Sequence, residues 1–258
     1  MKTVKAKFLR VSEEINALDF LEKAGRFILE TENNPLAWKW VTISLHGALY
    51  GFAICACKGT NPERVIDFKS KHNVFHTLGG LPAEIEKEGF PKNLKIEFNP
   101  KKKRIVFKGA MSNDIRNMLL SLSKNPPYQK AINEIYLKSH RLISFDEAIK
   151  RCQDPSRMKM TIMSKPLQLT NEQKESIEIL KHMLRNNFEH FIPKAWSIEI
   201  HGMPQITIDV LDVIRFLAIE TGNYILLNST KIRKVKSIVF QSKRFLKKSK
   251  LYKEALVE

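Results

Sequence analysis

The sequence predicts a mainly α-helical protein, and three observations support this prediction. Capping signals precede several segments in which apolar residues recur every three or four positions. The chain has 258 residues, 43% of them hydrophobic, which is enough for a packed core. Alternation typical of β-strands is confined to one stretch between residues 94 and 107. We therefore expect a helical bundle with an inserted region that contains a small β-hairpin.

Two helices are expected at the start of the chain. Ser12 can cap a helix that begins with two glutamates, which suit the positive end of the helix dipole, and that ends near Thr31. Asn34 is the expected cap of a second helix that starts at Pro35 and runs to about Lys58. Small residues form one stripe of this second helix and would allow another helix to approach closely: Ser44, Gly47 or Ala48, Gly51 and Cys55.

The stretch from Val41 to Cys57 is nearly all apolar, so a membrane helix has to be weighed against a core helix. At 17 residues and with His46 inside it, the stretch lies at the bottom of the range for crossing a bilayer. We prefer a buried core helix, expect no membrane association, and expect His46 to be a core histidine with its hydrogen bonds satisfied. The N-terminus lacks the hydrophobic region of a signal peptide, which predicts a cytoplasmic protein.

The sequence pattern changes from Thr60 to about Met111, and we expect residues 60–165 to form an insertion between helical pairs. Residues 94–98 and 104–107 flank a basic tip, which is the pattern of a short β-hairpin. Capping residues and apolar spacing predict three helices in this region: Ser112 to Leu122, Tyr128 to His140, and one from Ser144 toward Arg151.

Two further core helices are expected in the second half of the chain. A capping box at Thr170 opens the first, which should end near His190 because Pro193 disfavours helical backbone at the residue before it. The second is expected after Pro204 and should stop at Gly222. The predicted core therefore comprises residues 12–58 and 172–222.

The formal net charge of +17 is the main pointer to a partner. A charge of this size attracts polyanions: nucleic acid first, then an acidic membrane surface or an acidic protein. Residues 231–258 form a basic amphipathic element, and a solvated charged face is the alternative interpretation of each basic cluster. The residues expected to hold RNA are Lys101, Lys102, Lys103 and Arg104 in the hairpin, and Lys243, Arg244, Lys247 and Lys248 near the C-terminus.

No metal or cofactor site is expected. Cys55, Cys57 and Cys152 form no C-x-x-C pair, and the first two side chains diverge on one helix, so neither a disulfide framework nor a zinc site is predicted. His72 and His76 have the spacing of half a helical metal site, but no other cluster completes it. The sequence contains no P-loop, G-x-G-x-x-G, G-x-S-x-G or H-E-x-x-H motif.

Arg185, Asn186 and His190 are the candidate catalytic residues. Arginine offers a permanent charge and a planar set of N–H donors that match phosphate oxygens, while histidine exchanges protons near neutral pH. An RNA 2′-hydroxyl could attack its own phosphate with His190 as general base or acid and Arg185 stabilising the extra negative charge. Asn186 would hold an oxygen or orient the histidine, and no metal would be needed.

Helix geometry sets a condition on this site. A straight helix turns by about 100° per residue, so Arg185 and His190 would lie roughly 140° apart. Either the helix distorts near its end, or two copies of the motif meet across a two-fold dimer interface. The alternative is an ordinary helix terminus, where a cation is favourable. Three nearby aromatic residues could stack on a base, although core packing is the preferred interpretation: Phe188, Phe191 and Trp196.

The stretch from Leu184 to His190 resembles the motif of the HEPN (higher eukaryotes and prokaryotes nucleotide-binding) family. Catalytic members of this all-α family carry an arginine, usually followed by a polar residue, and then a histidine. The resemblance covers the helices at 12–58 and 172–222 but not the hairpin region. It implies a HEPN-like bundle and a metal-independent endoribonuclease that acts as a homodimer, often as a toxin or phage-defence component and sometimes with a nucleotidyltransferase antitoxin. A catalytically silent module that binds nucleic acid or an acidic protein is the alternative.

Overall fold

The computed structural model describes residues 8–68, 95–99, 104–108, 112–124, 140–183, 197, 199–223 and 228–255. They belong to two compact units: one comprises residues 1–65 and 144–258, and the other comprises residues 66–143. The fold is mainly α, as predicted, and each unit is described by itself.

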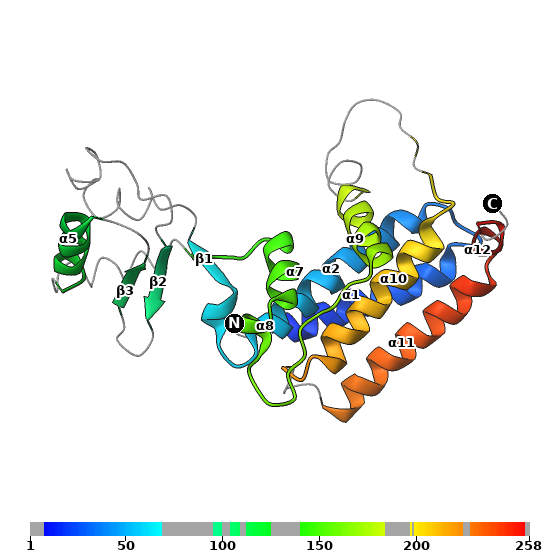
Figure 1. Cartoon of the computed structure of the whole chain (residues 1–258). Helices are drawn as coiled ribbons and strands as arrows, with labels where there is room; N and C mark the ends of the chain where they lie inside the picture. The colour runs from blue at the N-terminus through cyan, green and yellow to red at the C-terminus, as the bar shows by residue number, and fades with distance from the viewer. Residues whose placement is uncertain are drawn as a thin grey trace, which may run out of the picture. The chain divides into compact units, whose positions relative to one another are not determined.

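The larger unit is a bundle of helices drawn from both ends of the chain (Figure 1). The elements in chain order are α1 (Glu13–Glu30), α2 (Ala37–Lys58), the 3-10 turn η1 (Pro62–Val65), α7 (Phe145–Gln153), α8 (Pro155–Met158), α9 (Asn171–Met183), α10 (Met203–Arg215), the π-helical turn η3 (Phe216–Glu220), α11 (Ser229–Lys248) and α12 (Lys250–Glu254).

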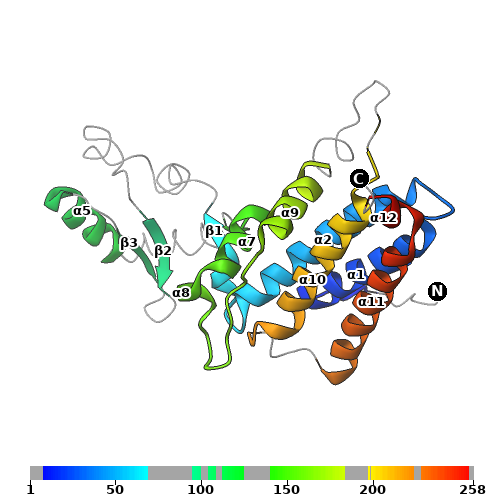
Figure 2. The same cartoon turned by 45° about the vertical axis from the view of Figure 1, so that its right-hand side comes forward.

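Helix α2 lies at the centre of this bundle, where α1, α7, α9 and α10 pack against it (Figure 2). Leu45, Leu49 and Phe52 are fully buried. By length and composition α2 could cross a membrane. In this fold most of its side chains are covered by neighbouring helices, which is the core position that the sequence predicted.

Close packing of α1 on α2 depends on two glycines of α2. A Cβ atom at Gly47 would lie 2.7 Å from the ring of Phe20, and one at Gly51 would lie 2.7 Å from the Cβ atom of Ala17. Neither distance is compatible with a side chain larger than hydrogen. The predicted stripe of small residues is therefore the surface against which α1 packs.

Side-chain caps set the starts of α7 and α9, as the sequence predicted. Thr170 and Gln173 form a complete capping box, in which each side-chain oxygen accepts the other residue's backbone N–H at 3.2 Å. The Ser144 hydroxyl accepts a backbone N–H in the first turn of α7 at 3.3 Å. The predicted cap of the second helix is wrong: Asn34 accepts the N–H of Leu36 at 3.1 Å within the preceding turn, and α2 begins at Ala37 without a side-chain cap.

Helix α10 packs between α9 and α11. Ser176 of α9 donates a hydrogen bond to Asp209 of α10 at 2.8 Å. At its other end α10 continues into η3 and stops at Gly222, whose φ of +71° favours glycine. A Cβ atom there would lie 2.4 Å from the carbonyl oxygen of Met163, so this predicted stop also requires glycine for space.

The smaller unit contains the predicted hairpin. Strands β2 (Lys95–Asn99) and β3 (Arg104–Lys108) are antiparallel, and Glu97 lies opposite Val106. The helix predicted after this hairpin is also confirmed: Ser112 accepts a hydrogen bond at the start of α5 (Asn113–Lys124).

A second pair of strands was not predicted. Strand β1 (Ile66–Phe68) pairs with β4 (His140–Leu142) in antiparallel register. The helix predicted over residues 128–140 is therefore wrong at its end, because His140 belongs to β4, and its remainder lies outside the described residues. The smaller unit, residues 66–143, spans fewer residues than the insertion expected over 60–165, because α7 and α8 pack against α2 in the larger unit.

Candidate functional site

The predicted catalytic residues Arg185, Asn186 and His190 lie outside the described residues, as do the three aromatic residues that follow Arg185 and were considered for base stacking. The structure describes the helix before them. Helix α9 reaches Met183 and packs against α10 and α2, with Leu180 fully buried. The motif thus follows directly on a core helix, while its own geometry stays a prediction.

The predicted RNA-binding residues belong to two different units. Residues 101–103 lie outside the described residues, and Arg104 begins β3 opposite Asn99. The other four residues all lie on α11, where they line one groove: Lys243, Arg244, Lys247 and Lys248.

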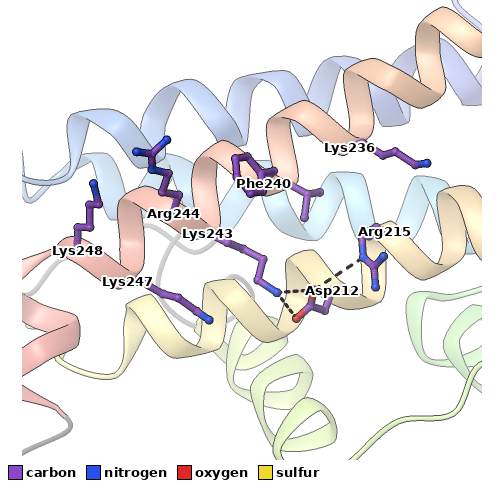
Figure 3. A pocket seen from close by; sticks show the side chains of 9 residues that line it. Asp212, Arg215, Lys236, Phe240, Lys243, Arg244, Lys247 and Lys248 are labelled. Carbon is purple, nitrogen blue, oxygen red and sulfur yellow. Dashed lines mark hydrogen bonds and ion pairs between the residues drawn. The ribbon is translucent and has the colours of Figure 1, made fainter.

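The groove lies between α10 and α11 and has a volume of about 580 Å³ (Figure 3). Residues at intervals of three or four along α11 share one helix face, and this periodicity brings most of the lining together. The lining residues are Asp212 and Arg215 of α10, and Lys236, Val239, Phe240, Lys243, Arg244, Lys247 and Lys248 of α11.

Asp212 is the single carboxylate among the residues that line the groove, and it neutralises Lys243. The Nζ atom of Lys243 lies 2.7 and 2.6 Å from the two carboxylate oxygens of Asp212 (Figure 3). Arg215 lies 4.0 Å from Asp212 and pairs more closely, at 2.8 Å, with Glu220. Four exposed cations have no carboxylate partner within the described part of the chain: Lys236, Arg244, Lys247 and Lys248.

The opposite side of α11, which faces α1, has its charges paired. Lys231 contacts Glu14 at 2.5 Å, and Lys234 pairs with Glu22. Helix α11 contains no acidic residue of its own, so its partners come from neighbouring helices. Because α1 supplies two carboxylates and the groove wall of α10 supplies one, the excess of positive charge faces the groove.

Phe240 lies among the unpaired cations, one helical turn from Lys236 and from Arg244 (Figure 3). Its side chain is 66% exposed. An exposed aromatic ring among cations can stack on a nucleobase while the cations contact the adjoining phosphates. Sequence reasoning missed Phe240, Lys236 and Arg215. The four-residue spacing of Lys236, Phe240 and Arg244 was a usable signal for the first two, whereas Arg215 is far away in the sequence.

The described residues offer no group of three or more potential metal ligands. His46 stacks on Phe145 of α7 with ring centroids 4.5 Å apart. Its place between α2 and α7 fits the expected core histidine.

Comparisons with protein-family models, with curated proteins and with solved structures find no match to this chain. The HEPN resemblance therefore stays a prediction from the motif. Among the arrangements that the structure describes, the groove is the most specific.

Proposed function

We propose that this protein binds RNA in the α10–α11 groove and cleaves it without a metal ion at a HEPN-type site. The observation that carries the proposal is a set of four cations around the exposed ring of Phe240, none of which pairs with a carboxylate of the described residues. Phosphates are attracted by such cations, and every base has a face that can stack on an aromatic ring. Single-stranded RNA offers both groups at short intervals, which makes it the polyanion that best fits this groove.

Cleavage is assigned to Arg185, Asn186 and His190 because of their spacing and chemistry. His190 takes the proton of the attacking 2′-hydroxyl or gives one to the leaving 5′-oxygen, and Arg185 stabilises the negative charge on the phosphate. The products are a 2′,3′-cyclic phosphate and a free 5′-hydroxyl. The packing of the helices supports this assignment. Helix α10 is hydrogen-bonded to α9, the helix that precedes the motif, and α10 also forms one wall of the groove.

A homodimer belongs to this proposal. Two copies of the motif can supply an arginine and a histidine to each other across a two-fold axis, which a single straight helix cannot do. The family resemblance further suggests a toxin or phage-defence role, with a nucleotidyltransferase antitoxin as a partner. The second candidate function is a catalytically silent module that binds RNA or an acidic protein, and it is favoured by the groove alone.

The cleavage half is tested with labelled RNA in EDTA. Wild-type protein is compared with Arg185→Ala and His190→Ala, and the 3′ ends of the products are analysed. We expect wild-type protein to produce 2′,3′-cyclic phosphate ends and both variants to produce none. If wild-type protein binds RNA without cutting it, the enzyme is rejected in favour of the silent module. Cleavage that persists in both variants would show that other residues carry the chemistry.

The binding half is tested by neutralising the groove. Lys236, Arg244, Lys247 and Lys248 are all changed to Gln, and binding of single-stranded RNA is measured over a range of salt concentrations. With four phosphate contacts removed, we expect RNA binding to weaken at least about 100-fold. The slope of the logarithm of the binding constant against the logarithm of the salt concentration should become shallower by about 2 to 3. A matched control makes the same change of charge at exposed positions elsewhere: Lys23, Arg26, Lys159 and Lys174 to Gln. Equal losses in the two proteins would mean that net charge, not the groove, binds RNA.

A further inference from the structure

Two of the three cysteines lie next to each other although they are far apart in the sequence. The Sγ atoms of Cys57, in the last turn of α2, and Cys152, near the end of α7, are 3.3 Å apart. Both side chains are buried and no disulfide joins them. The Cys57 thiol also lies 3.5 Å from the carbonyl oxygen of Ala148, so the pair is part of the contact between the two helices.

A small pocket of about 110 Å³ gives access to one member of this pair. Cys57 lines the pocket and Cys152 does not. The volume is several times the roughly 30 Å³ that a water molecule occupies in the liquid, so a small polar solute can enter. The other lining residues are Ser156 and three arginines: Arg64, Arg151 and Arg157.

The arginines of this pocket are held by polar partners. Arg151 bonds the carboxylate of Glu147 and the carbonyl oxygen of Arg64, both at 2.6 Å. Arg64 donates to the carbonyl oxygen of Arg157 at 3.3 Å, and Arg157 lies 3.6 Å from Asp154. Each arginine therefore has a polar partner, and Arg151, whose side chain is 13% exposed, is the one held most firmly beside the Cys57 thiol.

The two thiols differ in acidity. A hydrogen bond from Cys152 lowers the pKa of Cys57, and the charges of Arg151 and Arg157 act in the same direction, whereas burial and the carboxylate of Glu147 oppose them. The same hydrogen bond, together with burial, raises the pKa of Cys152 well above its ordinary value. Cys57 thus lines the pocket and has a lowered pKa, whereas Cys152 is the covered neighbour with a raised pKa.

We propose that Cys57 and Cys152 are a peroxide-reactive pair whose oxidation joins α2 and α7 by a disulfide. The Cys57 thiolate attacks one oxygen of hydrogen peroxide, the O–O bond breaks, and sulfenic acid and hydroxide form. Cys152 then gives up its proton and attacks the Cys57 sulfur; the S–O bond breaks, and the departing oxygen leaves as water. In sum, two thiols and one peroxide become one disulfide and two waters.

The position of this bond in the chain gives it a structural consequence. Helix α2 leads through η1 into the smaller unit at Ile66, and α7 begins just after that unit ends at Ile143. A disulfide between Cys57 and Cys152 would therefore link the segment that enters residues 66–143 to the segment that leaves them. This inference does not depend on RNA binding or cleavage.

The test treats folded, full-length protein with hydrogen peroxide, blocks the remaining thiols, and maps disulfide-linked peptides by mass spectrometry without reduction. We expect a link between Cys57 and Cys152 that dithiothreitol removes. Cys55→Ser is the matched control, since this buried cysteine lies on the same helix, and it should leave the link intact. In Cys152→Ser, the sulfenic acid of Cys57 should accumulate and react with dimedone.

Three results would overturn the inference. The first is no linked peptide in wild-type protein at peroxide concentrations that oxidise free glutathione. The second is a link that involves Cys55 or two different molecules. The third is a link that forms only after heat denaturation, which would show that the folded protein does not present the pair. The mapping of wild-type protein decides the question even if a serine variant fails to fold.

Discussion

The larger unit has two cavities lined by cations, the groove and the pocket beside Cys57, and they differ in whether those cations have bonded partners. In the α10–α11 groove, four of the lining cations are exposed and unpaired with any described carboxylate. In the pocket beside Cys57, each of the three arginines is bonded to a carbonyl oxygen or a carboxylate. A cation without a partner can be neutralised by an incoming phosphate, whereas a bonded one mainly supplies a fixed local charge. The groove is therefore suited to a large polyanion and the pocket to a buried thiolate.

Net charge alone therefore does not locate a binding surface. The total of +17 belongs to the whole chain. Helix α11 has no acidic residue, and its neighbours α1 and α10 supply carboxylates unevenly on its two sides. Helices α7 and α8, in contrast, begin with carboxylates that pair with their own arginines. The groove and the pocket therefore differ mainly in whether their cations are paired with carboxylates, and less in the number of cations.

Oxidation of the proposed thiol pair beside the pocket should change the free energy of unfolding more than any substitution considered below. A disulfide between Cys57 and Cys152 would close a loop of roughly 100 residues, for which chain entropy alone gives a stabilisation of about 4.7 kcal/mol. Urea unfolding of peroxide-treated and of reduced protein measures this difference, with Cys152→Ser as the control that should show no change. Coincident unfolding curves for proven disulfide-linked and reduced protein would contradict the expected stabilisation.

Two matched substitutions test whether the bonded arginines of the pocket and the unpaired cations of the groove differ in their contribution to stability. Arg151→Met removes bonds to Glu147 and to the carbonyl oxygen of Arg64, so the free energy of unfolding should fall by about 2 kcal/mol. Arg244→Met in the groove removes an exposed, unpaired cation and should change stability by less than about 0.5 kcal/mol. RNA affinity should show the reverse order, with a larger loss in Arg244→Met than in Arg151→Met. Equal destabilisation by the two variants in urea unfolding would remove the distinction between fixed and available cations.

Much of this fold could be predicted because helix signals are local. Thr170 and Gln173 lie three residues apart and cap α9, and Gly47 and Gly51 mark the stripe on which α1 packs. Strand β4 was missed because its pairing with β1 joins residues more than 70 positions apart. A three-residue strand carries too little alternation to outweigh the helical pattern before it.

The candidate sites show the same limit. Four cations on the α11 side of the groove could be predicted because a basic amphipathic helix is visible in its own sequence. Arg215 and Asp212 come from another helix, and only folding brings them to α11. Cys57 and Cys152 were set aside because they form no short-range motif, and the 3.3 Å contact between their sulfur atoms depends on how α7 packs against α2.

In the groove, the exposed ring of Phe240 should contribute to RNA binding. Phe240→Ala should weaken binding of single-stranded RNA by about tenfold, since loss of one base–aromatic stack is worth 1–3 kcal/mol. Stability should change little, because the ring is mostly exposed. Fluorescence anisotropy with a short labelled RNA measures the effect, and Phe240→Tyr, which keeps an aromatic face, should bind like wild type. Unchanged affinity of the alanine variant would leave only phosphate contacts in the groove.

The smallest effect expected has the opposite sign. Asp212 neutralises Lys243 and repels phosphate, so Asp212→Asn should strengthen RNA binding about threefold, in line with the modest free energy of a partly exposed ion pair. Asp209→Asn is the control, because it makes the same change of charge on the same helix but contacts Ser176 of α9 rather than lining the groove. If Asp212→Asn weakens binding instead, the carboxylate must be holding Lys243 in a productive position, and a paired cation would then be part of the binding surface.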